Sequence, residues 1–225
     1  DSAVIIGMNA GFSNMTSGAD GTIAIGHAAL NALTTGAGNV AIGIEALDAC
    51  TIGNYNTAVG GYALTVSVDG DFNTAIGFQA LEIYEGGDGE GSNTAVGYRA
   101  GEFVSTGQRN TFVGKSAGQG VTGARLTGTD NTAVGQDCGL LLQGAADANT
   151  LIGRSAGNSM TTGTNNTCIG YDADTDDATA TNQSVIGYGT TGVADNSVTL
   201  GNASVTAVYM ASDSGAVVHC AGIDM

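Results

Sequence analysis

The chain has 225 residues, of which 38 are glycine and none is proline or tryptophan. Proline has no N–H to donate and is excluded from strands paired on both sides, so its absence favours a chain built almost entirely of paired strands over a disordered glycine-rich linker. The formal net charge of −16 repels nucleic acid and anionic membranes, and no apolar run reaches the ~20 residues of a membrane helix. We therefore expect no nucleic-acid partner and no membrane insertion.

Along the chain, a five-residue unit of the form Asn-Thr-Ala-Val/Ile-Gly recurs twelve times. The units end at Gly7, Gly26, Gly43, Gly60, Gly77, Gly97, Gly114, Gly135, Gly153, Gly170, Gly187 and Gly201. Their basic spacing is 17 residues, with occasional short insertions. A fixed period of this length is typical of a repeat architecture in which each unit packs against its neighbours.

Each unit is predicted to be a short strand, because β-branched residues dominate its second and fourth positions. The residue before the glycine is aliphatic in all twelve copies. The residue two positions before this aliphatic residue is Thr in seven copies. These two positions share one face of a strand. We predict that this face points into the core, and that the Ala between them faces another chain or a neighbouring sheet.

Two further positions repeat, and they suggest how the coils turn. Asn opens eight of the twelve units, and Ala follows the glycine by three residues in nine of them. Asn tolerates left-handed backbone and bonds to nearby backbone, so it suits a turn into a strand, and stacked coils allow amide ladders. The rest of each repeat is polar and variable, as in Glu82–Gly91 and Gly118–Asp130, and is predicted to form outward loops.

These features predict an all-β fold: a stacked-coil β-solenoid (parallel β-helix or β-roll) of about twelve 17-residue repeats. At ~3.3 Å per residue one repeat traces about 56 Å, enough for two or three short strands, and coils stacked ~4.8 Å apart form a rod about 58 Å long. The period of two in the repeated positions and the abundant glycine argue against a helical solenoid.

No catalytic, cofactor-binding or metal-binding residue is predicted, and the chain is not expected to be an enzyme. Its two Gly-x-Ser-x-Gly sequences, at Gly114–Gly118 and Gly153–Gly157, are part of the repeat, and its two histidines, His27 and His219, lack a triad-like pattern. The cysteines have no zinc-type spacing and are interpreted as free thiols: Cys50, Cys138, Cys168 and Cys220. Cys138 and Cys168 replace Ala of the repeat, so we predict that both are buried.

Two acidic segments invite comparison with calcium sites. The carboxylates of Asp172, Asp174, Asp176 and Asp177 lack the glycine and the bidentate glutamate of a calcium loop, and are interpreted as an outer-loop insertion. The sequence GGDGEG at Gly86–Gly91 is similar to a calcium-binding nonapeptide repeat but occurs once. The basic residues are Arg99, Arg109, Lys115, Arg125 and Arg154. They are interpreted as partners of loop carboxylates, with a contact patch as the alternative.

The repeats "NTAVGYRAG", "NTFVGKSAG", "NTLIGRSAG" and "NTAIGFQAL" resemble the coil repeats of bacteriophage tail fibres and tailspikes. They are also similar to the head repeats of trimeric autotransporter adhesins, and the resemblance covers Val4 to Gly201. The segment Asn196–Met225 resembles the stretch before the intramolecular chaperone of endosialidase-type phage fibres.

The resemblance implies a homotrimer of three identical chains, with a chaperone removed after Met225. It divides the chain into a repeat shaft, residues 1–201, and a C-terminal tail that closes the trimer, residues 202–225. It implies a fibre or spike of a virion, hence extracellular, that attaches to a glycan or protein receptor on a host surface. In a trimer, a ring of His219 side chains is a minor metal hypothesis. Since the chain begins at Asp1 rather than Met, we expect a fragment or a processed product.

Three other functions are compatible with parts of the sequence. A bacterial adhesin head would require a coiled-coil stalk and a membrane anchor. A polysaccharide depolymerase would use paired carboxylates and aromatic rings that stack on sugars, and seven tyrosines are present: Tyr55, Tyr62, Tyr84, Tyr98, Tyr171, Tyr188 and Tyr209. An ice-binding solenoid would need flat, exposed threonine arrays, and we expect these threonines to share a face with buried Val and Ile.

Overall fold

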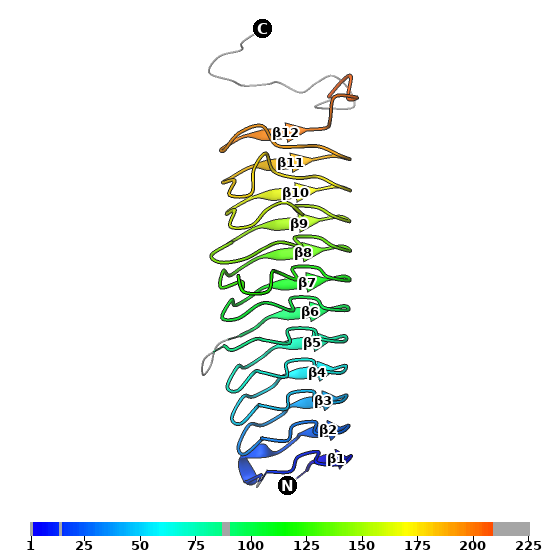
Figure 1. The fold of residues 1–225 in the computed structure, drawn as a ribbon, viewed down its shortest axis with the longest axis vertical. Coiled ribbons are helices and arrows are strands. Elements are labelled where there is room, and N and C mark those ends of the chain that lie inside the picture. The colour runs from blue at the N-terminus through cyan, green and yellow to red at the C-terminus, as the bar shows by residue number, and fades with distance from the viewer. Residues whose placement is uncertain (1, 14, 87–90, 209–225) are drawn as a thin grey trace, which may run out of the picture.

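The computed structural model of this chain describes residues 2–13, 15–86 and 91–208. Its coils stack into a rod with one short strand per coil, and the twelve strands form a single sheet in sequence order (Figure 1). The strands are β1 (Val4–Ile6), β2 (Ile23–Ile25), β3 (Val40–Ile42), β4 (Thr57–Val59), β5 (Thr74–Ile76), β6 (Thr94–Val96), β7 (Thr111–Val113), β8 (Thr132–Val134), β9 (Thr150–Ile152), β10 (Thr167–Ile169), β11 (Ser184–Ile186) and β12 (Val198–Leu200). The described residues hold one turn of 3₁₀ helix, η1 (Ser17–Ala19), and no α-helix. The predicted parallel β-solenoid is confirmed.

The strands pair in a parallel register that superimposes equivalent positions of the repeat. Thr57 pairs with Thr74 and Val59 with Ile76, so each position forms a column along the rod. The prediction of two or three strands per coil is wrong, because left-handed residues such as Leu47 (φ 51°) interrupt extended backbone elsewhere in the coil. Even there, backbone groups bond from coil to coil, as from Leu47 N to Ala63 O at 3.0 Å. Because backbone N–H groups outside the strands also donate to the next coil, proline would lose a hydrogen bond there too, which fits its absence from the chain.

The glycine that ends each strand is required by its backbone and by the next coil. Gly60 has φ +134°, and a Cβ atom there would lie 2.4 Å from the carbonyl oxygen of Gly77. Real Cβ atoms do not approach an oxygen this closely, and an L side chain rarely adopts this φ. Equivalent close approaches recur up the column: a Cβ atom on Gly97, for example, would lie 2.3 Å from the carbonyl oxygen of Gly114.

The strands face the opposite way from the prediction. The middle residue of the strand points into the coil and is fully buried, as in Ala58 and Ala75, whereas Thr57 and Val59 on either side are only half-buried. The aliphatic and threonine columns therefore form the outer surface of the sheet, and the Ala column lines the core. Alternation along a strand defines two faces but does not say which of them is inside.

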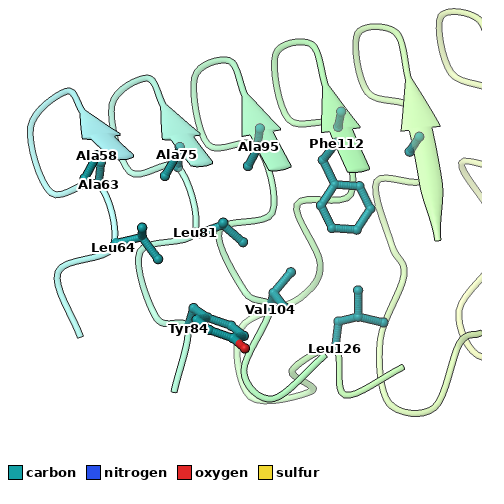
Figure 2. Close-up of a cluster of buried hydrophobic side chains, with 14 of the residues drawn as sticks. Ala58, Ala63, Leu64, Ala75, Leu81, Tyr84, Ala95, Val104, Phe112 and Leu126 are labelled. Carbon is teal, nitrogen blue, oxygen red and sulfur yellow. The ribbon is translucent and has the colours of Figure 1, made fainter. Parts of the chain in front are cut away.

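The core is completed by residues from the turns that follow the strands, and their size complements the strand position (Figure 2). In β4 and β5 the strand contributes Ala58 and Ala75, and a buried leucine lies six residues further on, at Leu64 and Leu81. Phe112 replaces the strand alanine in β7, and glycine takes the leucine position in that coil. The aromatic ring fills this space, because a Cβ on Gly118 would lie 2.3 Å from ring atoms of Phe112.

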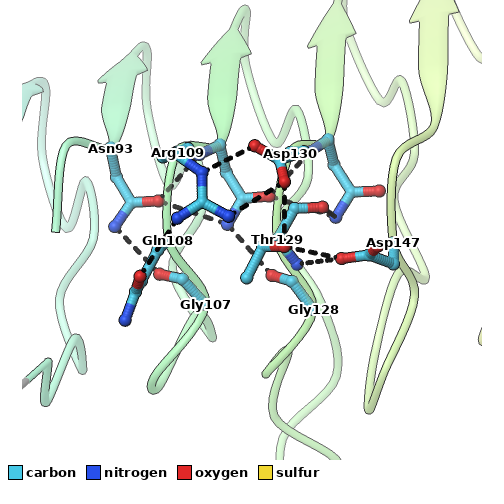
Figure 3. A network of polar contacts seen from close by, with 10 residues as sticks. Asn93, Gly107, Gln108, Arg109, Gly128, Thr129, Asp130 and Asp147 are labelled. Carbon is cyan, nitrogen blue, oxygen red and sulfur yellow. Dashed lines mark hydrogen bonds and ion pairs between the residues drawn. The ribbon is translucent and has the colours of Figure 1, made fainter. Parts of the chain in front are cut away.

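A buried column of asparagine amides runs beside the strands, as the sequence suggested. Asn110 Oδ1 accepts hydrogen bonds from the backbone N and the Nδ2 of Asn131, both at 3.0 Å, and Asn110 Nδ2 donates to Asn93 Oδ1 at 3.2 Å and to Gly128 O at 3.1 Å. Figure 3 shows part of this column. The ladder consists of Asn39, Asn56, Asn73, Asn93, Asn110, Asn131, Asn149 and Asn166. The predicted amide ladder is confirmed.

Candidate functional site: an exposed sheet face and its rims

The most distinctive surface is the solvent side of the sheet, which we call the outward face. It consists of the first and third residues of the twelve strands β1–β12, which lie at Val4, Ile6, Ile23, Ile25, Val40, Ile42, Thr57, Val59, Thr74, Ile76, Thr94, Val96, Thr111, Val113, Thr132, Val134, Thr150, Ile152, Thr167, Ile169, Ser184, Ile186, Val198 and Leu200. All of these residues are aliphatic or carry a hydroxyl, and none is charged. This is a selective arrangement in a chain with 21 acidic residues.

The aliphatic column of the outward face is open to solvent along its length. The exposed fraction is 40% for Ile76, 41% for Ile152 and 40% for Ile186, although the residue before each of them in the strand is completely buried. Isolated apolar residues are normal on a protein surface, whereas a contiguous apolar patch marks an interaction site. The outward face is such a patch, because parallel pairing aligns equivalent residues at every step of the rod.

Aromatic side chains border the outward face at both ends of the strands. We call the residues two positions before each strand the leading rim. Two of them, Tyr55 and Phe72, have left-handed backbone, are exposed, and stack with ring centroids 5.5 Å apart. We call the residues directly after the strand-ending glycines the trailing rim, where Phe78 and Tyr98 stack at 5.8 Å. The leading rim is therefore aromatic at β4 and β5, and the trailing rim is aromatic at β5 and β6.

The trailing rim carries a second stack higher on the rod. Tyr171 and Tyr188 lie with ring centroids 5.3 Å apart, and the Arg154 guanidinium lies 5.4 Å from the Tyr171 ring centroid. Similarly, the Arg99 guanidinium lies 5.2 Å from the Tyr98 centroid. Since each stacked ring turns a face towards its neighbour, these tyrosines pack against aromatic rings of the adjacent coil. Tyr84, in contrast, is buried in the core.

Several basic residues pair with carboxylates, in agreement with the sequence interpretation. Arg109 donates to both carboxylate oxygens of Asp130, at 2.8 and 3.0 Å, and holds the pKa of that carboxyl below its usual value (Figure 3). Arg125 joins Glu85 at 3.3 Å, which links the two longest insertions of the chain. The Arg109–Asp130 pair joins neighbouring coils, the Arg125–Glu85 pair joins coils that are two apart, and each exposed pair contributes little stability in water.

Among the described residues, two carboxylate side chains are buried, Asp71 and Glu102. Glu102 accepts a hydrogen bond from Gln119 Nε2 at 2.5 Å and lies 3.7 Å from Arg99 Nε. Burial raises the pKa of Glu102, and the contacts with Gln119 and Arg99 oppose that rise only in part. The Glu102 carboxylate contacts Gln119 and Arg99, and neither contact indicates a role in chemistry on a substrate.

The cysteines behave as the sequence indicated where they are described. Cys50, Cys138 and Cys168 are free thiols and all are buried, and burial raises the pKa of each to about 12. A thiol with so high a pKa is a poor nucleophile and a poor metal ligand. His27 is exposed. Cys220 and His219 lie outside the described residues, as do Tyr209 and most of the predicted C-terminal tail.

The acidic loop near β10 uses its carboxylates locally. Asp174 accepts from the backbone N of Ser159 at 3.1 Å, and Asp177 accepts from the backbone N of Thr179 at 2.6 Å. Asp176 accepts from Gln183 Nε2. Within the described part of the chain, no three His, Cys, Asp or Glu residues gather in a way that would hold a metal ion. The sequence GGDGEG falls largely on residues that are not described.

Sequence reasoning missed the outward face as a candidate site because it assigned the aliphatic column to the core. The signal was present in the leucines that follow the strands. Leu30, Leu47, Leu64 and Leu81 recur six residues after the alanine of four successive strands, β2–β5, and they already fill a thin coil. A core that holds these leucines leaves room only for Ala on the strand.

The described residues define the chain as a parallel β-solenoid repeat protein with an uncharged, exposed sheet face. No helix among them is long and apolar enough to cross a membrane. No family model, no curated protein and no solved structure matches the chain.

Proposed function

We propose that this chain is a rigid, non-catalytic segment of a virion fibre or spike, which assembles as a homotrimer outside the cell and attaches to a receptor on a host surface. The observation that carries the proposal is the outward face. At ~4.8 Å per coil it is about 58 Å long, and at a width of roughly 10 Å it covers on the order of 600 Å². This is the upper end of the patches left open on monomeric proteins.

Charge favours a second copy of the chain as the cover for this face. With a net charge of −16, two copies repel each other over most of their surfaces. They approach at least electrostatic cost through the outward face, where no residue is charged. The repeats also resemble fibres that are trimeric, which is why we propose three copies, and the variable loops on the other sides of the coil remain free to contact a glycan or protein receptor.

Oligomeric state tests the assembly. We expect the purified chain to have the mass of three copies in sedimentation or light-scattering experiments. Ile76→Asp, which places a carboxylate on the outward face, is expected to shift the population to monomers. The matched control is Val68→Asp, because Val68 is 44% exposed in an outer loop, close to the 40% of Ile76. A monomeric parent chain, or equal dissociation of the two variants, would contradict the assembly.

Attachment is tested separately, on intact cells. We expect the fluorescently labelled trimer to bind a subset of bacterial strains, and the free trimer to compete with infection of those strains by the phage that carries it. A trimer that binds no strain of a broad panel would contradict receptor attachment while leaving the assembly intact.

Ice binding is a second candidate, because the reason against it does not hold. The threonines do not share a face with buried residues: Thr occupies the first position of seven consecutive strands, β4–β10, on the exposed outward face. A flat, regular array of hydroxyl and methyl groups is what an ice-binding solenoid would need. Inhibition of recrystallisation in a polycrystalline ice film by the parent chain and not by Thr111→Tyr would support this function, and crystal growth equal to that in buffer would exclude it.

A further inference from the structure

We infer that the trailing rim between β7 and β11 binds a polysaccharide that carries carboxylates, with Arg154 binding a carboxylate and Tyr188 packing against a sugar ring. This inference rests on the receptor attachment proposed above, and it names the chemical class of the receptor and the residues that contact it. In chain order, this part of the rim consists of Lys115, Gln136, Arg154, Tyr171 and Tyr188.

The pairing of the basic residues sets Lys115 and Arg154 apart from the others. The chain has 21 acidic residues and only five Lys and Arg. Arg99, Arg109 and Arg125 lie 3.7, 2.8 and 3.3 Å from a carboxylate oxygen. Lys115 and Arg154 are exposed, and within the part of the chain that the structure describes neither forms an ion pair. In so acidic a chain, two unpaired cations on one rim are available to a negatively charged ligand.

Stacking positions the Arg154 guanidinium without using its hydrogen-bond donors. Its central carbon lies 5.4 Å from the Tyr171 ring centroid, a cation–π contact, and its N–H groups donate to no described residue. Arg99 stacks on Tyr98 in the same way at 5.2 Å, but its Nε donates to Gln79 at 2.9 Å. A planar guanidinium that is already positioned loses little freedom on binding, and its parallel N–H groups match the two oxygens of a carboxylate.

The tyrosines next to Arg154 provide a surface for a sugar ring. Tyr171 stacks with Tyr188 of the following coil, with ring centroids 5.3 Å apart. Tyr188 is the last ring of this stack and is 71% exposed, and the next position of the rim is Asn202. A tyrosine that is stacked on one face and otherwise open presents an apolar ring beside a polar hydroxyl, which suits the C–H groups and hydroxyls of a sugar.

The spacing of the two cations restricts the kind of polymer. Lys115 and Arg154 belong to coils two apart, which at ~4.8 Å per coil places them about 10 Å apart along the rod. Gln136 lies between them and donates to Asp137, so the middle position adds no positive charge. The net charge of −16 also repels densely charged polymers. These features favour a polysaccharide with a carboxylate on alternate sugars over a polymer that is charged at every unit.

Binding to defined polymers tests the ligand class. The probes are a polymer of alternating glucuronate and N-acetylglucosamine, the same polymer with its carboxylates reduced to alcohols, and poly(glycerol phosphate). We expect the purified chain to bind only the first. Binding of the acidic and the reduced polysaccharide with equal affinity, binding of poly(glycerol phosphate) alone, or binding of none of the three would overturn the inference.

Variants test the two contacts. Arg154→Gln is expected to raise the dissociation constant about tenfold or more, because a hydrogen bond to a charged group is lost. The control Arg125→Gln removes the same charge from an outer loop and should leave the constant unchanged. Tyr188→Ser should weaken binding as well, whereas Tyr55→Ser, which removes a ring that is 60% exposed on the leading rim, should not. All four variants are expected to keep the mass and the melting curve of the parent chain, which separates a lost contact from a lost fold.

Intact cells separate this inference from the proposed attachment. If Arg154→Gln binds a strain as tightly as the parent chain does, attachment stands and the inference fails. If the parent chain binds the acidic polysaccharide but no strain of a broad panel, the ligand site stands and attachment fails. A chain that binds neither would overturn both.

Discussion

Replacing Asn110 with alanine is expected to destabilise the solenoid more than any surface change. The amide makes four hydrogen bonds within the ladder, to Asn93, Gly128 and Asn131. Its loss removes the acceptor of the buried Asn131 backbone N and the donor to the Gly128 carbonyl. Each buried polar group left without a partner costs about 1–3 kcal/mol, so the free energy of unfolding should fall by about 2–6 kcal/mol. That is a large part of the ~5–15 kcal/mol typical of a folded domain.

The assay is chemical denaturation followed by circular dichroism, at one fixed chain concentration because association adds to the apparent stability. The matched control is Gln136→Ala, which removes an exposed amide from the coil of β8 and should change the free energy of unfolding by about 0.5 kcal/mol or less. If Asn110→Ala unfolds at the same denaturant concentration as the control, the ladder does not stabilise the stack and the reasoning fails.

Three further predictions concern the core and its ionisable groups. Phe112→Ala leaves the space beside Gly118 empty and should lower the free energy of unfolding by about 3–5 kcal/mol, whereas an unchanged melting curve would mean that the coil collapses around the gap. In a chain carrying Cys220→Ser, the thiols of Cys50, Cys138 and Cys168, with their pKa raised to about 12, should not react with a thiol reagent at pH 8 until denaturant is added; rapid modification of this variant in its native state would contradict their burial. Because burial raises the pKa of Glu102, its contribution to stability is greatest below the usual value of about 4.3 and declines as the pH rises through the raised pKa. Glu102→Gln should therefore flatten the dependence of the denaturation midpoint on pH above that value, and parallel pH profiles would refute the assignment.

Much of the architecture follows from the sequence because the repeat imposes the same environment on every copy. The glycines that end the strands predicted the register, since a column in which Gly60 approaches the Gly77 carbonyl tolerates no side chain. Asn110 and its equivalents predicted the ladder, because a buried amide in a stack finds the next amide one coil away. Position and spacing alone were sufficient for both.

The orientation of the strands was not predictable from alternation, and the candidate site was misplaced with it. Val59 is more apolar than Ala58, which favoured placing Val59 inside. The space inside the coil places Ala58 there instead, because Leu64 of the same coil already occupies the core. The left-handed backbone at Leu64, with φ 51°, is the second feature that the sequence hid, since leucine rarely adopts it. It explains why only one side of each coil is a strand.

The coil-to-coil register at the strand-ending glycines has a consequence for how such a chain varies between generations. Successive glycines stay aligned although the segments between them differ in length, because the turns away from the sheet absorb the extra residues, as between Gly114 and Gly135. A recombination event that removes or duplicates one repeat therefore leaves both new neighbours with matching columns. The rod can be shortened or extended in steps of ~4.8 Å without a new fold being needed, so its length is a property that selection can adjust one coil at a time.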